Sequence, residues 1–359
     1  MPLFMDLHKA SDYDVKPTAE EIKRNHIADL NVQDKYGVKF LQYWINEEAG
    51  MVFCLMEGPD KESCAAVHQE AHGNMPCHII ALQGGDYKTF IGEDIHVNEF
   101  DIVENADGTF DTGYRIFVTI DWISFSGNEL VSKIIPEIAT CSEGRFLPKP
   151  SSMRETIVFS AAIPAIRCAV NLLQEVKRNQ TSSAEIRIGV SAGEPVTDKN
   201  DFYGHAIQLA NRLCDAAQTH QVLVSPLVKR LAGDLFLQLQ VTEKSLKPLT
   251  PEDEKFLNQL ITETASRFYH PAFTIEDLRK SMALSKSNLY RKITSLTGLS
   301  ANAFIRELRL RKALQLIRDK YGNVTEVAYE AGFNNPSYFT KSFQRRFGML
   351  PIQVLKSDA

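Results

Sequence analysis

The feature that most constrains this chain is a pattern that occurs twice between residues 273 and 347. Each copy predicts a helix, a tight turn and a second helix, because apolar residues recur at helical spacing on both sides of the turn. A shift of 50 positions superposes Leu289 on Phe339 and Gly298 on Gly348, and a glycine at that place is typical of a helix end. The last part of the chain is therefore expected to be all-α, with two small helical cores.

Charge is distributed unevenly along the chain. Residues 255–359 contain 17 Lys and Arg against 8 Asp and Glu, a balance of +9. The remaining residues contain 23 basic and 37 acidic side chains, a balance of -14, so that the whole chain has a net charge of -5. A basic segment joined to an acidic body is typical of a nucleic-acid-binding domain attached to a module that does not bind nucleic acid.

Several runs in and between the two copies match one family pattern without a gap: Ser287–Lys292, Thr297-Gly298, Arg309–Ala313, Val327-Ala328, Ala331–Phe333, Ser337–Phe339, Phe343, Phe347-Gly348 and Pro351. On these runs, residues 255–359 resemble the AraC-type DNA-binding domain. The resemblance implies a double helix-turn-helix, in which the second helix of each copy enters a major groove of double-stranded DNA.

The residues that would contact DNA lie in the first turns of the two recognition helices. Their side chains face base edges, while neighbouring positive charges hold phosphates. Asn can pair with adenine and Arg with guanine. A connecting helix over about residues 301–318 should hold the two copies about one duplex turn apart. For any single residue the alternative is a plain solvated helix face. The predicted contacts are Ser285, Lys286, Ser287, Asn288, Tyr290, Arg291, Asn335, Ser337, Tyr338, Thr340, Lys341 and Arg345. Of the basic residues on the second helix, Arg345 and Arg346 are expected nearer the DNA backbone.

Residues 1–84 predict a small α+β unit with the element order β-α-β-β-α-β of a ferredoxin-like fold. Thr18 and Glu21 have the spacing of a capping box at the start of the first helix. The segment resembles a family of small nickel-binding ferredoxin-like proteins. The runs that carry this resemblance are Pro2–Asp6, His8, Tyr36–Val38, Tyr43-Trp44, Phe53–Leu55, Ala65–His68 and Glu70–Gly73.

Four histidines in this segment are candidate metal ligands. His68 and His72 are four residues apart on one helix, so both rings can reach one nickel, copper or zinc ion. His8 follows the first strand and His26 lies on the first helix. We predict that these four histidines include the ligands of nickel or another divalent transition metal. The alternative is that they are surface or hydrogen-bonded histidines without a metal.

The middle of the chain contains a second recognisable pattern, in the runs Arg115–Asp121, Glu185–Glu194, Phe202–Gly204, Ala206–Ala210, Arg212-Leu213 and Gln221–Ser225. On these runs, residues 114–236 resemble a class III nucleotidyl cyclase, a family of ferredoxin-like α+β domains. The resemblance implies two metal-binding aspartates, because these enzymes displace a nucleotidyl group with two metal ions.

The catalytic positions implied by the cyclase resemblance are only partly present. Asp121 falls at the first aspartate position and Arg212 matches the arginine that stabilises the transition state. The second aspartate should lie near Met153, but no aspartate occurs between Asp121 and Asp198. Gln208 replaces the asparagine that orients the ribose. The resemblance therefore indicates a degenerate, non-enzymatic domain in which Asp121 and Arg212 are vestigial.

Length and composition agree with several soluble units. The chain has 359 residues, of which 44% are hydrophobic and 24% charged. Nowhere do 18 apolar residues run together, and the first residues lack a basic region followed by an apolar one. We therefore expect a cytoplasmic protein that does not bind membranes. The six cysteines are scattered without a C-x-x-C pair, which favours buried free thiols.

These observations predict a multidomain protein with two ferredoxin-like α+β domains followed by an all-α double helix-turn-helix domain. The expected boundaries are 1–84 for the possible metal-binding domain, 85–112 for a connection, 113–240 for the cyclase-like domain, 241–254 for a polar linker and 255–359 for the DNA-binding domain.

The favoured function is a DNA-binding transcriptional regulator that reads two adjacent major grooves. Its N-terminal domains would receive a metal, a nucleotide or a partner protein, and the chain would form a homodimer. One alternative is an active nucleotidyl cyclase that carries a DNA-binding domain. Another is that the N-terminal body serves purely as a dimerisation scaffold.

Overall fold

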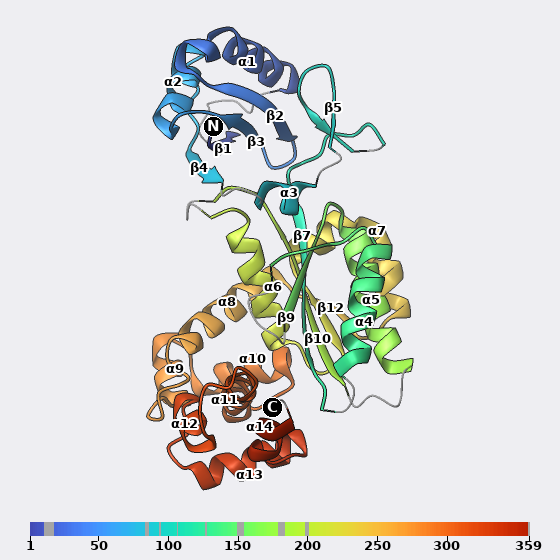
Figure 1. Ribbon diagram of the computed structural model, residues 1–359, viewed down its shortest axis with the longest axis vertical. Coiled ribbons are helices and arrows are strands. Elements are labelled where there is room, and N and C mark those ends of the chain that lie inside the picture. Colours follow the sequence, from blue (N-terminus) through green and yellow to red (C-terminus); the bar gives the residue numbers. More distant parts are fainter. Residues whose placement is uncertain are drawn as a thin grey trace.

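The computed structural model describes residues 1–10, 18–82, 86–92, 95–105, 107–125, 128–148, 154–178, 184–197 and 201–357. They form three units that follow one another along the long axis of the molecule (Figure 1). An α+β unit at the N-terminus is joined to a larger sheet with helices, and a purely helical unit follows. No described helix combines the length and the apolar character that crossing a bilayer requires.

The N-terminal unit has the predicted order of elements. Its bounds are β1 (Leu3–Lys9), α1 (Ala19–Val32), the 3-10 helix η2 (Gln33–Tyr36), β2 (Lys39–Asn46), β3 (Met51–Glu57), α2 (Lys61–Ala71) and β4 (His78–Leu82). The sheet has the strand order β2-β3-β1-β4, and β1 is antiparallel to both neighbours. The predicted capping box of Thr18 and Glu21 starts α1.

The segment after β4, predicted as a connection over 85–112, contains regular structure. It includes α3 (Asp86–Ile91) and the antiparallel strands β5 (His96–Val97) and β6 (Val103–Glu104). Arg115 donates from Nε to the carbonyl of Phe90 and forms an ion pair with Asp111, so the connection is tied to the next unit. The predicted boundary near residue 84 lies outside the described residues.

The middle unit is a six-stranded sheet with the order β12-β11-β10-β7-β9-β8. Helices α4, α5 and α7 cover one face and α6 covers the other (Figure 1). The elements are β7 (Arg115–Ile123), α4 (Asn128–Cys141), β8 (Arg145–Phe146), β9 (Arg154–Phe159), α5 (Ala162–Arg178), β10 (Glu185–Gly193), α6 (Gly204–Ala216), β11 (Gln221–Val224), α7 (Pro226–Thr242) and β12 (Leu246–Pro248).

The structure differs from the predicted linker over 241–254. Strand β12 lies within it and pairs in parallel with β11 at the edge of the middle sheet. Leu246 and Leu249 are buried, which anchors this segment although most of its other residues are polar. Residues 246–248 therefore belong to the middle sheet, and the helical unit begins with α8 at Pro251, inside the predicted linker.

The C-terminal unit contains the two predicted helix-turn-helix copies. Its helices are α8 (Pro251–Ala265), α9 (Ile275–Ser281), α10 (Lys286–Thr297), α11 (Ala301–Arg318), α12 (Val324–Glu330), α13 (Pro336–Phe347) and α14 (Pro351–Ser357). Gly298 and Gly348 end α10 and α13 with φ values of 71° and 76°, a conformation that glycine adopts without strain.

Each helix-turn-helix copy has its own hydrophobic core, and each core extends into the middle unit. Leu209 and Leu213 of α6 pack with the core of the first copy. Ile123, at the end of β7, packs with Phe339 and Phe343 of the second copy. The basic unit is therefore docked on the middle unit at two places, on α6 and at the end of β7.

The cysteine prediction is confirmed in part. All six are free thiols, and Cys54, Cys64, Cys168 and Cys214 are buried. Contrary to the prediction, Cys77 is half-buried and Cys141, the last residue of α4, is exposed.

Candidate nucleic-acid interface and candidate metal site

The first candidate DNA-reading helix is α10. Ser285 caps it, and its hydroxyl accepts a hydrogen bond from the backbone N–H of Asn288 at 3.3 Å. Leu289 and Ile293 are fully buried and fix which face of the helix turns inward. The predicted contact residues lie on the opposite face: Ser285, Lys286, Ser287, Asn288 and Arg291 are exposed, and Tyr290 is half-buried.

The second candidate reading helix, α13, is built in the same way. The side-chain oxygen of Asn335 accepts a hydrogen bond from the backbone N–H of Tyr338 at 2.9 Å, and Pro336 occupies the first turn. Phe339 and Phe343 are fully buried. Of the predicted contact residues, Asn335, Ser337, Tyr338, Lys341 and Arg345 are exposed, and Thr340 is half-buried.

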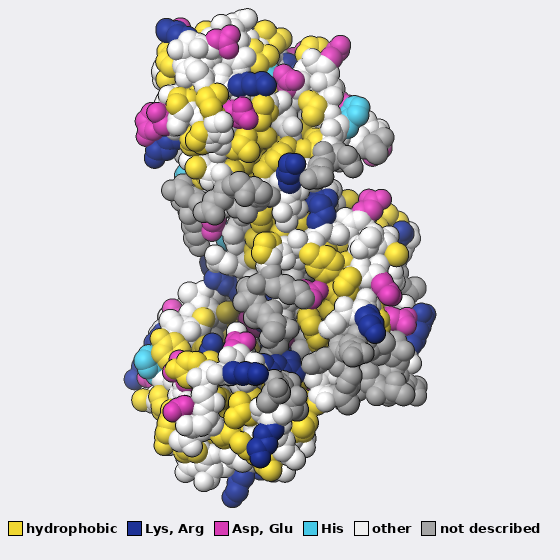
Figure 2. All heavy atoms as spheres, in the orientation of Figure 1, with side chains coloured by type: hydrophobic (Ala, Val, Ile, Leu, Met, Phe, Trp, Pro, Cys, Tyr) yellow, Lys and Arg dark blue, Asp and Glu magenta, His cyan; other side chains and the backbone are white. Residues whose placement is uncertain are grey.

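One exposed arginine near these faces is absent from the predicted contacts. Arg306, on α11, makes a side-chain hydrogen bond to Tyr338, and this bond together with Ser342 lowers the pKa of the Tyr338 phenol. Arg306 and Arg345 line a cavity of about 530 Å³ that also contains the end of α10. Sequence reasoning treated α11 as a spacer, and the only signal for Arg306 was its position on that helix. Figure 2 shows further Lys and Arg side chains over this lower unit.

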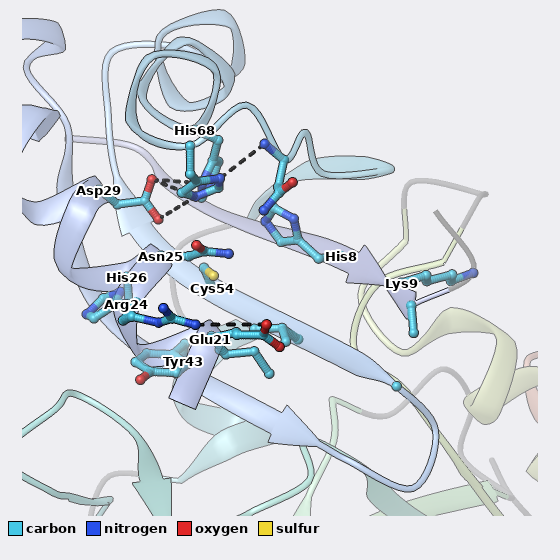
Figure 3. A pocket seen from close by; sticks show the side chains of 16 residues that line it. His8, Lys9, Glu21, Arg24, Asn25, His26, Asp29, Tyr43, Cys54 and His68 are labelled. Atoms are coloured by element: carbon cyan, nitrogen blue, oxygen red, sulfur yellow. Dashed lines mark hydrogen bonds and ion pairs between the residues drawn. The ribbon is translucent and has the colours of Figure 1, made fainter. Parts of the chain in front are cut away.

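The candidate metal site lies between β1 and the two helices of the N-terminal unit. Residues alternate along β1, so Met5 and Leu7 pack toward the middle unit while Asp6 and His8 face the helices. Asp6, His8 and His68 place one ligand atom each within 4.8 Å of one another, and so do Asp29, His68 and His72. His68 belongs to both groups. Figure 3 shows His8, His68 and Asp29 at one end of a pocket of about 440 Å³.

His68 is held between two carboxylates. Its Nε2 lies 2.8 Å from Asp6 Oδ2, and its Nδ1 lies 3.1 Å from Asp29 Oδ1, an ion-pair contact without hydrogen-bond geometry. Burial disfavours the imidazolium, but the two carboxylates outweigh burial and raise the pKa of His68 to about 10. Burial also opposes ionisation of Asp6, yet His8 and His68 hold the pKa of Asp6 below its ordinary value. The group is thus a charged carboxylate–imidazolium–carboxylate cluster.

The other predicted histidines take different positions. His72 Nε2 lies 3.2 Å from Asp29 Oδ1, so this ring joins the cluster. His26 does not join it: its Nε2 pairs with Asp101 Oδ2 at 3.1 Å, and its ring packs against Tyr43. The structure thus brings together His8, His68 and His72 and leaves His26 elsewhere on the pocket wall (Figure 3). Sequence reasoning missed Asp6 and Asp29, because single aspartates gave no spacing signal.

The vestigial cyclase positions are also separated. Asp121, on β7, forms ion pairs with Arg154 of β9 and with Arg311 of α11. Arg212 points to α8, where its Nη1 donates to Asn258 Oδ1 at 2.9 Å. The expected position of the second aspartate, near Met153, lies outside the described residues.

Comparisons with known proteins agree with two of the three resemblances at the level of domains. Residues 278–357 match a helix-turn-helix domain, and residues 4–82 match the nickel responsive protein SCO4226-like family. The transcriptional activator RhaR of Enterobacter sp. (strain 638) is 32% identical over 128 residues, which cover 34% of this chain and 45% of RhaR. The chain spans between 9% and 55% of the length of the first curated relatives that it matches.

Two solved structures are similar to separate parts of the chain. SCO4226 from Streptomyces coelicolor is 32% identical and covers 22% of this chain and 94% of its own, with a TM-score of 0.21. An adenylate/guanylate cyclase/hydrolase from Silicibacter pomeroyi is 19% identical and covers 34% of this chain and 81% of its own, with a TM-score of 0.29. The fold family of the middle unit therefore stays a prediction. The chain carries a helix-turn-helix domain of the AraC type at residues 278–357 and a domain of the SCO4226-like family at residues 4–82.

Proposed function

We propose that this protein is a sequence-specific DNA-binding transcriptional regulator that reads two adjacent major grooves. The observation that carries this proposal is the pair of capped helices, α10 and α13, whose polar faces are open to solvent while their apolar faces fill separate cores. The connecting helix α11 contains 18 residues. A helix of that length measures about 27 Å, which is comparable to the 34–36 Å between successive major grooves on one face of a duplex.

Base reading and phosphate binding are assigned to different residues. Asn288 and Arg291 lie one turn apart on the exposed face of α10 and have the amide and guanidinium groups that recognise adenine and guanine. Arg306 on α11 and Arg345 in the last turn of α13 are exposed and are better placed for phosphates between the two grooves. Specificity should therefore depend on α10 and α13, and general affinity on the arginines around them.

Selection of bound sequences from a random DNA pool tests this proposal. The expected result is a site with two recognition elements about one helical turn apart, or about 10 base pairs. Arg291→Ala should weaken binding to the selected site by about 1 to 3 kcal/mol and leave binding to random DNA nearly unchanged. An equal loss on both DNAs would make Arg291 a phosphate contact, and a pool without enrichment would refute the proposal.

A divalent transition metal such as nickel is the proposed input. The donors of the His68 cluster are imidazoles and carboxylates, a set that fits nickel, zinc or copper. His8, His68 and His72 would hold the ion, with Asp6 and Asp29 as further ligands or as partners that orient the rings. A bound ion would supply positive charge in place of the proton on His68. The fit is supported by the proximity of these groups, and the matched family is one of nickel responsive proteins.

Calorimetric titration of nickel into the full chain tests the metal proposal. We expect uptake that His72→Ala weakens, with His78→Ala as the control because His78 belongs to neither ligand group. The selection of bound DNA should then be repeated with and without nickel, ATP and GTP. Absence of uptake of nickel and zinc would remove the metal and leave the N-terminal unit a scaffold.

The middle unit is proposed to be a non-catalytic coupling and dimerisation module. The support is that the Asp121 carboxylate is engaged by the guanidinium groups of Arg154 and Arg311, so a catalytic metal ion would have to displace two positive charges. Incubation with manganese and ATP or GTP should yield no cyclic nucleotide. Cyclic nucleotide formation that Asp121→Ala abolishes would establish the cyclase alternative instead, and sedimentation would test the homodimer.

A further inference from the structure

The junction between the middle sheet and the helical unit contains a charge pattern with a defined register. Arg187 of β10 and Asp121 of β7 are cross-strand partners, and Glu307 and Arg311 are one turn apart on α11. Arg187 Nη2 donates to Glu307 Oε1 at 2.7 Å, and Arg311 forms an ion pair with Asp121. All four residues are buried, with at most 9% of their surface exposed.

The two spacings match, which explains why both pairs form at once. Neighbouring residues across antiparallel strands are about 4.5–5.5 Å apart, and residues four apart on a helix are about 5–6 Å apart. The signs alternate on both sides. A shift of α11 by one turn would place Glu307 against Asp121 or Arg311 against Arg187, so like charges would meet in a buried interface. The arrangement therefore selects one register of α11 on the sheet.

A third residue of the middle unit, Glu185, connects the second candidate reading helix, α13, to the same strand. Glu185, two residues before Arg187 on β10, accepts two hydrogen bonds from Arg346 near the end of α13, at 2.8 and 2.6 Å. Arg346 Nε also donates to Glu307 Oε2 at 2.7 Å. Arg346 was expected close to the DNA backbone, but it is turned toward the middle sheet. One guanidinium thus joins α13, α11 and β10.

These contacts matter because the two helix-turn-helix copies do not share a core. The first copy packs with α6 and α8. In addition, Lys247 Nζ donates a hydrogen bond to the backbone carbonyl of Ser295, near the end of α10. The second copy packs around Phe339 and Phe343 and reaches the middle sheet through Ile123 and Arg346. The angle between α10 and α13 therefore depends on how both copies are fixed to α11, which contributes to both cores, and to the middle unit.

We propose that Asp121, Glu185 and Arg187 are positioning residues that hold α11 in register and orient α13, and so determine which spacing between two DNA recognition elements the chain accepts. This inference rests on the proposed DNA-binding function. It agrees with the general behaviour of buried ion pairs, whose best attested use is to specify one register, since their net contribution to stability is small.

The test measures affinity against spacing. One set of DNA probes contains both elements selected by the wild-type chain, separated by the selected spacer or by a spacer one or two base pairs longer or shorter. A further probe contains the first element alone. Each added base pair moves the second element by about 3.4 Å and about 35°. The wild type should prefer one spacer by about tenfold over its neighbours, as expected when one good contact is lost.

Glu185→Gln keeps the shape of the side chain and removes its charge, and it should reduce the spacer preference to threefold or less. Affinity for the single first element should stay within twofold of the wild type, which also shows that the variant is folded. Glu185→Asp, which keeps the charge with a shorter reach, should give an intermediate preference. The matched control is Glu47→Gln, an exposed glutamate in a turn of the N-terminal unit.

Each other outcome has one interpretation. Variants that keep the full spacer preference overturn the positioning role and leave the proposed function intact. Variants that lose affinity for the single element as well overturn it in favour of a general structural role. A wild-type chain that selects no DNA at all removes the proposed function, and the positioning role with it.

Discussion

Replacing Asp6 by Asn should strongly destabilise the N-terminal unit. Asp6 is fully buried, and its two oxygens accept from the backbone N–H of Cys54 at 2.9 Å and face His68 Nε2 at 2.8 Å. Asn keeps the size but removes the charge, so the buried imidazolium loses one of its two carboxylates. Breaking a buried ion pair at one partner costs about 3–5 kcal/mol, a large part of the roughly 5–15 kcal/mol that stabilises a typical domain.

Tryptophan fluorescence during urea unfolding measures this effect. The chain has two tryptophans, Trp44 and Trp122, in different units. A Trp122→Phe background leaves Trp44, which is fully buried in the N-terminal unit, as the reporter. The control is Asp34→Asn, an exposed aspartate of the same unit, which should change the free energy of unfolding by no more than about 0.5 kcal/mol.

The same cluster predicts a pH dependence when a chelator keeps metals away. Folding raises the pKa of His68 from 6.5 to about 10, so its contribution is complete below about pH 6.5 and is lost as the pH rises toward 10, by about 1.4 kcal/mol per unit. The pKa of Asp6 is lowered from 3.8, so its contribution is present above that pH and is lost as the pH falls through the lower folded value. Stability should be greatest between about pH 4 and 6.5.

Two results would refute this reasoning. One is a loss of less than about 1 kcal/mol in Asp6→Asn, which would mean that the imidazolium does not depend on its carboxylates. The other is a free energy of unfolding that stays constant from pH 7 to pH 9.5.

Three further substitutions test the helical unit. Phe343→Ala, at a fully buried position, should cost about 3–5 kcal/mol, seen as a lower melting temperature by circular dichroism, and an unchanged temperature would contradict the assigned core. Tyr338→Phe removes the hydroxyl that bonds to Arg306 and should weaken DNA binding by about 0.5–1.5 kcal/mol in fluorescence anisotropy. Arg306→Ala should weaken binding to selected and random DNA equally and lower the salt dependence of binding, and a loss confined to the selected site would make it a base contact.

Much of the fold could be predicted from the sequence because it depends on short-range chemistry. The caps at Thr18, Ser285 and Asn335 lie within three residues of the N–H groups that they accept from. Gly298 and Gly348 end their helices through their own backbone conformation. The helices of the C-terminal unit, their inward faces and the order of helices and strands along the N-terminal unit were predicted from chemistry at this range.

The candidate sites depended more on the tertiary structure. The pairing of His68 and His72 followed from helical spacing, but Asp6 reaches His68 across 62 positions and Asp29 reaches His72 across 43. His26 was grouped with them by residue type alone, and only the fold shows that Asp101 holds it apart. A carboxylate that acts as a partner over such separations has no pattern in the neighbouring sequence.

The sequence by itself determined that the C-terminal unit contains two capped helices with exposed polar faces, because periodicity and capping act over a few residues. Only the tertiary structure decided how those helices are held. Arg187 meets Glu307 across 120 positions and Glu185 meets Arg346 across 161. These ion pairs form where charged residues of the middle sheet lie opposite charged residues of the helical unit. That arrangement depends on how the middle unit and the helical unit pack together. Part of the predicted linker likewise forms an edge strand, because it pairs with β11 and because Leu246 is buried against the sheet.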